Sequence, residues 1–201
     1  MRKTQLESQR NMIYSSATDK NGKVSLSKAQ KKEIGNINSM ITEVNKSVND
    51  ITDMINDKNN DYVFKDASLN GGLPQTMRTG SAEVTIYFDD YDKKVHEGRH
   101  GGQIARGEYD INTSGNLTSG SFGASKEVDA YKAQLSAVGQ ILYKPYLDFS
   151  NPSNLLKINQ VQTVTELNDI NNSFLQSLVD NPGLNQSLIY PPATNTSYYA
   201  Q

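Results

Sequence analysis

Both histidines of the 201-residue chain stand in one short motif with a glutamate between them. His96, Glu97 and His100 form an H-E-x-x-H pattern. Residues four apart share one face of a helix, so the two imidazoles can converge on a single ion. Glu97 then lies beside that ion, where its carboxylate can take a proton from water that the ion activates. The pattern therefore predicts a zinc site with hydrolytic chemistry.

A catalytic zinc ion is usually held by three protein side chains, so a third ligand is needed. The chain has no cysteine and no further histidine, which indicates an acidic ligand. The candidates are Glu108, Asp110, Glu127 and Asp129. In a helix predicted from Ser125 through Leu142, Glu127 borders the apolar stripe and Asp129 points away from it. This favours Glu127, with Asp110 as the alternative, because a short turn after the active helix could return it to the site.

Amide hydrolysis also needs a hydrogen-bond donor for the oxygen of the reacting carbonyl. Tyr131 lies one helical turn after Glu127 and is the predicted donor. Tyr109 and Arg99 are the alternatives. Each of these side chains could equally serve in packing or at the surface, so their spacing alone leaves the choice open.

The elements around the motif indicate a mixture of helices and strands. Glu83–Phe88 alternates polar and bulky residues, which predicts a strand. Asp92 can cap a helix that carries the histidines to about Arg106, although it contains glycines at 98, 101 and 102. Each glycine costs about 1 kcal/mol relative to alanine. Close approach of another element, or of substrate, would explain them.

A long helix is predicted before the motif. Ser27 and Gln30 form a capping box, and no proline interrupts the chain from there to Asp57. Apolar residues then recur at alternating spacings of three and four: Ile34, Ile37, Ile41, Val44, Val48, Ile51 and Ile55. This narrow stripe predicts either a helix packed across its own domain or a coiled-coil contact with a partner or with preceding chain.

Loop-forming residues from 58 to 78 suggest a boundary, with a short strand at Tyr62–Phe64. We expect an N-terminal helical segment over residues 1–60 and a catalytic domain over 61–201. Within that domain the sequence predicts a loop from Gly107 to Ala124 and a helix from Thr163 to Val179. The end, with Pro191–Pro192 and Tyr198–Tyr199, is expected to be an extended tail.

The charge balance limits the classes of partner. Twenty basic and 22 acidic side chains give a formal charge of -2, which provides no general attraction to nucleic acid or anionic lipid. No window is apolar enough for a membrane helix, and no hydrophobic stretch of a Sec signal follows the charged N-terminus. We therefore expect a soluble chain, exported, if at all, by another route.

Three stretches resemble a known family. Val84–Phe88, Val95–Gln103 and Glu127–Gln134 are similar to the zincin-type toxin domains at the C-termini of bacterial Rhs and related polymorphic proteins. The resemblance covers residues 60 to 145 and rests on H-E-G-x-H-G and E-x-D-A-Y-x-x-Q. It implies a zincin-like α+β fold, in which a small sheet with an edge strand near 83–88 packs on the active helix and on the helix bearing Glu127. It also implies Glu127 as the third Zn²⁺ ligand.

The resemblance further implies a zinc metallopeptidase that is secreted, or delivered into a target cell by a non-Sec route, and cuts a protein there. A cognate immunity protein would be its partner. The competing hypothesis is a non-catalytic binding or scaffolding module that works through the helix Ile34–Ile55. In that case Glu97 would have no role, and its replacement by glutamine would change nothing.

Overall fold

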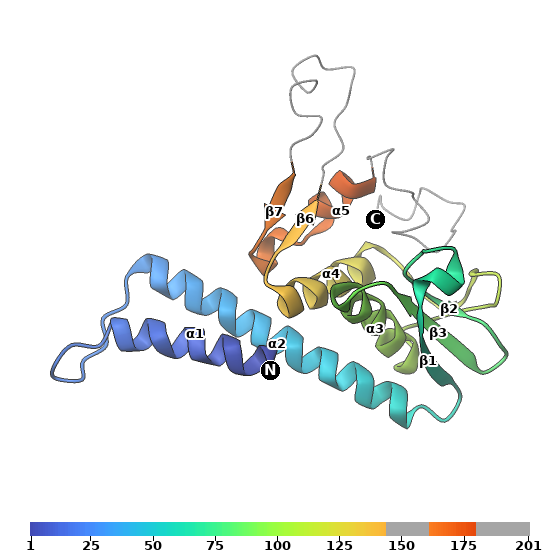
Figure 1. The fold of residues 1–201 in the computed structure, drawn as a ribbon, viewed down its shortest axis with the longest axis horizontal. Coiled ribbons are helices and arrows are strands. Elements are labelled where there is room, and N and C mark those ends of the chain that lie inside the picture. The colour runs from blue at the N-terminus through green and yellow to red at the C-terminus, as the bar shows by residue number, and fades with distance from the viewer. Residues whose placement is uncertain (144–160, 180–201) are drawn as a thin grey trace, which may run out of the picture.

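The computed structural model describes residues 1–143 and 161–179 and has the predicted α+β composition (Figure 1). Its helices are α1 (Arg2–Ser16), α2 (Lys28–Asn56), α3 (Tyr91–Ala105), α4 (Ala124–Val138) and α5 (Asn172–Val179), with short 3-10 helices η1 (Ala67–Asn70) and η3 (Leu167–Asp169). Its strands are β1 (Asp61–Asp66), β2 (Gln75–Arg78), β3 (Glu83–Phe88), β4 (Tyr109–Ile111), β5 (Leu117–Gly120), β6 (Ile141–Tyr143) and β7 (Gln162–Val164). The tail predicted at Pro191–Tyr199 lies outside the described residues.

Helices α1 and α2 form an antiparallel pair, in which α1 lies beside the N-terminal half of α2 (Figure 1). The predicted capping box is present: the Ser27 hydroxyl accepts from the Gln30 amide at 3.2 Å, and the Gln30 side chain accepts from the Ser27 amide at 2.9 Å. The start and end predicted for α2 are thus confirmed. Helix α1 was not anticipated, because its own pattern is only weakly amphipathic.

The apolar stripe of α2 divides into two parts. Ile34 and Ile37 are buried, and Ile37 belongs to the larger hydrophobic core. Val48, Ile51 and Ile55 are 61%, 42% and 77% exposed. Over this second half the buried face of the helix instead carries Glu43, Asp50 and Met54. Packing across the domain is therefore confirmed for the first half of the stripe only.

Two hydrophobic clusters form the core, one containing residues of α4 and the other a residue of α3. The larger cluster joins α1, α2, α4, the β6–β7 ribbon, η3 and α5: Leu6, Ile37, Met40, Ala124, Tyr131, Leu135, Ile141, Val164, Leu167, Ile170, Phe174, Leu175 and Leu178. The smaller cluster joins β3, α3 and β4: Val84, Ile104, Tyr109 and Ile111. The larger cluster anchors α4 and the smaller cluster anchors α3 through the burial of apolar surface.

The three-stranded sheet has the order β1-β3-β2, with β1 parallel and β2 antiparallel to β3. The prediction that residues 83–88 form an edge strand is therefore wrong, because β3 is central. Its residues Val84, Thr85 and Ile86 are completely buried, as expected of a strand covered on both faces. The edge strand that contacts α3 through a hydrogen bond is β2, whose Thr76 hydroxyl donates to the Glu97 carbonyl at 2.8 Å.

Three other predictions need correction. The segment 107–124 contains the paired strands β4 and β5, so it is not simply a loop. The helix predicted through Leu142 ends at Val138, because Gly139 adopts the left-handed conformation that terminates helices and residue 142 pairs in β6. The helix predicted from Thr163 begins only at Asn172, since residues 162–164 form β7. Among the described residues, no helix is long and apolar enough to cross a membrane.

Candidate metal centre

Helix α3 brings the two histidines to the same buried face. The helix begins after Asp90, two residues before the predicted cap, and the Asp90 side chain accepts from the Lys93 amide at 2.9 Å. His96 and His100 follow one turn apart, with ring centroids separated by 5.1 Å. Both side chains are 5% exposed. The helical phase predicted for the motif is confirmed.

Two of the three glycines on α3 allow neighbouring elements to approach closely. A Cβ at Gly101 would lie 2.6 Å from the Met54 sulfur and 2.8 Å from Ile86 Cδ1. A Cβ at Gly102 would lie 2.5 Å from the Asp50 side chain. The backbone of α3 therefore packs directly on α2 and β3, and the predicted close approach is by protein elements. Gly98 is different, because a Cβ there would meet no described atom within 4 Å.

Helix α4 supplies the acidic partner. Glu127, 2% exposed, has one carboxylate oxygen 3.5 Å from His96 Nε2 and the other 3.3 Å from His100 Nε2. The ligand atoms of the three side chains all lie within 4.8 Å of one another. Glu127, His96 and His100 are thus placed together, as the sequence predicted.

The two nitrogen–oxygen separations are those expected between ligands of one zinc ion. Ligand atoms at 2.0–2.1 Å from a tetrahedral zinc ion are about 3.4 Å apart, close to the two nitrogen–oxygen distances. The same distances are long for charge-assisted hydrogen bonds, which are typically about 2.7–2.9 Å. Glu127 Oε2 is moreover buried without a hydrogen-bond partner among the described residues. A carboxylate oxygen in that position is costly unless a cation satisfies it.

Without a metal, the three groups form a charged cluster. Burial by itself would lower the pKa of His100, but the Glu127 carboxylate raises it to about 9. Burial would conversely raise the pKa of Glu127, but His100 and His96 lower it to about 2. Glu97 also contributes to the raised pKa of His100, so its carboxylate acts electrostatically on the same centre.

The other acidic candidates are engaged elsewhere. Asp110 accepts from Arg78 at 2.7 Å and from the Ile111 amide at 2.8 Å. Glu108 pairs with Arg106 and Lys126. Asp129 lies 2.8 Å from Arg99. None of these three carboxylates belongs to the described histidine cluster.

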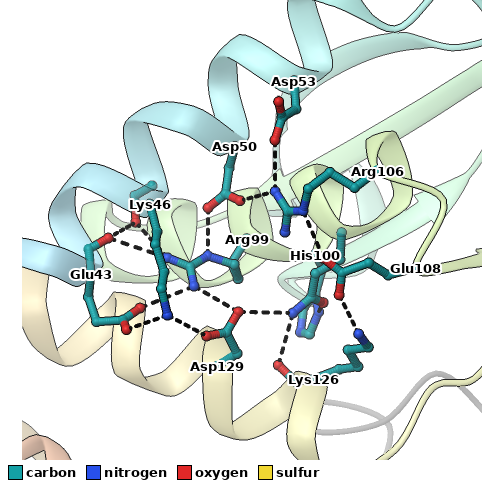
Figure 2. A network of polar contacts seen from close by, with 12 residues as sticks. Glu43, Lys46, Asp50, Asp53, Arg99, His100, Arg106, Glu108, Lys126 and Asp129 are labelled. Carbon is teal, nitrogen blue, oxygen red and sulfur yellow. Dashed lines mark hydrogen bonds and ion pairs between the residues drawn. The ribbon is translucent and has the colours of Figure 1, made fainter.

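Arg99 lies in a buried ion-pair network on another side of α3 (Figure 2). Its guanidinium contacts Asp50 at 2.5 Å, Asp129 at 2.8 Å and Glu43 at 3.2 Å. Burial opposes its charge, yet these carboxylates raise the pKa of Arg99, so it stays protonated. With its donors engaged in this way, Arg99 serves to join α2, α3 and α4, and it is not the carbonyl-polarising residue considered above.

Two tyrosines flank the cluster. The Tyr131 ring packs edge-on against His96, with centroids 4.5 Å apart, and also contacts Phe174. Tyr109 is buried, and burial together with the charges of Glu127 and Glu97 raises its pKa well above the usual value. Phe122 lies between the rings of Tyr109 and His100, at 4.8 and 5.6 Å. Both tyrosines thus remain candidate donors.

Comparison with known proteins identified no relative. No protein-family model, curated protein or solved structure matches this chain.

The sequence analysis missed two contacts of the H-E-x-x-H segment. Gln103 Oε1 lies 3.0 Å from His100 Nδ1, and Thr76 holds the Glu97 carbonyl. The first had a detectable signal, because residues three apart on a helix are neighbours. The second depends on the folding of β2 onto α3, which no local pattern reveals.

Proposed function

We propose that this chain is a zinc-dependent metallopeptidase with His96, His100 and Glu127 as metal ligands. The observation that carries the proposal is the placement of the Glu127 carboxylate 3.3 and 3.5 Å from the two Nε2 atoms. Two neutral imidazoles and one carboxylate are a frequent ligand set of catalytic zinc, and they leave one coordination position for substrate or water.

The residues around the cluster support a hydrolytic role. A bound zinc ion would supply the Lewis acidity that makes water nucleophilic near neutral pH. Glu97 would accept the proton of the attacking water and transfer it to the leaving nitrogen. Tyr131, or Tyr109 in its place, would donate a hydrogen bond to the developing oxyanion.

The edge strand β2 supports a peptide substrate. It is antiparallel to β3, lies at the border of its sheet, and contacts the active helix at the Glu97 carbonyl. An extended peptide added to such an edge would have its backbone aligned by main-chain hydrogen bonds. The resemblance to Rhs-type toxin domains adds a biological setting to the proposal: delivery into a target cell and neutralisation by an immunity protein.

Elemental analysis tests the metal first. We expect about one zinc per chain in the wild type and none in His96→Ala. Glu97→Gln should then retain zinc but lose hydrolysis of a peptide library, with a loss of at least about 100-fold. Zinc in stoichiometric amount in His96→Ala would disprove the ligand assignment, whereas full activity of Glu97→Gln would disprove the mechanism.

A second candidate function rests on the exposed half of the α2 stripe. Val48, Ile51 and Ile55 are solvent-accessible apolar residues at heptad spacing. A binding or scaffolding module would use this surface and would be unaffected by Glu97→Gln. Replacing Val48 and Ile55 by aspartate would abolish its function and leave peptide hydrolysis unchanged, so the two variants separate the candidates.

A further inference from the structure

Gln103 lies between His100 and the first turn of helix α4. Its side chain is completely buried and lies one turn beyond His100 on α3. Its amide oxygen is 3.0 Å from His100 Nδ1. Its amide nitrogen donates to the Lys126 carbonyl at 3.3 Å and lies 3.5 Å from the Asp129 carboxylate. One amide therefore contacts a histidine of α3 and two residues of α4, one position before and two positions after Glu127.

The neighbours of Gln103 fix which way its amide points. The Lys126 carbonyl and the Asp129 carboxylate are acceptors only, so the NH₂ group must face them. The amide oxygen must then face His100, where it can only accept a hydrogen bond. His100 consequently carries its proton on Nδ1, and the lone pair of the neutral ring is on Nε2. That nitrogen is the one lying 3.3 Å from Glu127.

Asp129 helps to fix the orientation of the Gln103 amide. It pairs with Arg99, which is itself fixed by Asp50 of α2 (Figure 2). The amide of Gln103 thus rests on a carboxylate whose position is set by a buried guanidinium. The His96 ring has no equivalent support, since its Nδ1 atom is buried without a hydrogen-bond partner in the described part of the chain.

We propose that Gln103 is the positioning residue of the metal centre: it selects the Nδ1–H tautomer of His100 and ties this ligand to the start of α4, next to Glu127. The inference rests on the proposed zinc site but not on peptidase activity. Outer-shell partners of this kind orient the ligand ring and raise its basicity, and their loss typically weakens metal binding about 10–100-fold.

The test compares two buried glutamines. Gln103→Met keeps the size of the side chain but removes both hydrogen-bonding groups. Gln134→Met is the matched control, because Gln134 is equally buried and donates to Asp92 at the start of α3. Zinc affinity is measured by competition with a chromogenic chelator. We expect a loss of about 10–100-fold for Gln103→Met and little change for Gln134→Met.

The tautomer itself provides a readout that needs no variant. In the zinc-bound wild type, long-range proton–nitrogen NMR should show the His100 proton on Nδ1 and a metal-shifted Nε2. In Co²⁺-substituted protein, the visible spectrum should change in Gln103→Met and not in Gln134→Met.

The outcomes separate this inference from the proposed function. If the wild type binds zinc and Gln103→Met binds it equally tightly, or if His100 is protonated on Nε2, Gln103 has no positioning role and the zinc site stands. A wild type that takes up no zinc overturns the metal centre and the inference together. Zinc binding with the expected loss, but without hydrolysis, supports the inference and disproves the peptidase.

Discussion

At the scale of single residues, the choice of Glu127 over Asp129 is the sharpest assignment. Both carboxylates lie on the first turns of α4, two positions apart. Glu127 faces the two histidines, whereas Asp129 faces Arg99. Helical phase alone predicted this difference, since about 200° of rotation separates the two side chains.

Matched amide substitutions test that assignment. Glu127→Gln removes the charged ligand and should weaken zinc binding by more than the about 10–100-fold typical of an outer-shell change. Asp129→Asn should stay within that range, because its contact to the site passes through Gln103. Affinities are measured by chelator competition at one pH. The opposite ranking would move the third ligand to Asp129.

The pKa of His100 predicts how the metal-free protein responds to pH. Its pKa is about 9 in the folded chain, against an ordinary value of 6.5. A raised folded-state pKa stabilises the fold fully below pH 6.5, and this contribution is lost as the pH rises through 9. We expect the metal-free wild type to lose up to about 3 kcal/mol of unfolding free energy over this range, since one pKa unit corresponds to about 1.4 kcal/mol.

Urea unfolding of chelator-treated protein at several pH values measures this loss. Glu127→Gln is the control, because removal of the carboxylate removes the main cause of the raised pKa. Its stability should vary less between pH 6.5 and 9 than that of the wild type. Equal pH dependence in both proteins would mean that other groups, and not the His100–Glu127 pair, cause it.

At the scale of elements, the position of α3 depends on its close contacts with α2 and β3. Gly102→Ala would place a methyl group 2.5 Å from Asp50, so the helices must separate. We expect this change to destabilise the protein by about 1–3 kcal/mol. Gly98→Ala meets no described atom within 4 Å and should be neutral, or stabilising by up to about 1 kcal/mol through helix propensity.

Denaturant unfolding of the two alanine variants measures the difference, with zinc content determined in parallel. The pair is well matched, because both changes add one methyl group to the same helix. If both variants were destabilised equally, the loss of stability in Gly102→Ala would not come from its close contact with Asp50.

Local signals made the elements near the motif predictable. The capping box at Ser27 and Gln30 located the start of α2, and the alternation in Glu83–Phe88 located β3. The place of β3 in the sheet could not be predicted, because strand order depends on pairing with residues 61–66 and 75–78. The hairpin of β4 and β5 was missed for a related reason, since its short strands lie in a segment rich in loop-forming residues.

At the scale of the whole molecule, helix α2 is tied to the part of α3 that carries the two histidines. Arg99 stands between the two histidines in sequence and forms ion pairs with Asp50 and Glu43 of α2. Removing one partner from such a buried network typically lowers the free energy of unfolding by about 3–5 kcal/mol. The sequence left Arg99 open between catalysis and packing or surface roles and could not reveal this network, because its partners lie 49 and 56 residues away.

The proposed ligands come from two helices, so zinc binding should stabilise the entire fold. His96 and His100 lie on α3 and Glu127 lies on α4, and zinc would join these helices. A ligand at 100 times its Kd stabilises the folded state by about 2.7 kcal/mol. For a chain of this size that corresponds to a rise in Tm of about 5–10 °C.

Thermal unfolding with zinc and with a chelator measures this rise, and His96→Ala is the control. The wild type should lose the added stability when the chelator is present, and the variant should unfold at one temperature in both conditions. A similar rise in His96→Ala would place the stabilising zinc elsewhere on the protein. A wild type without any rise would contradict the proposed zinc site, because a ligand that binds the folded state must stabilise it.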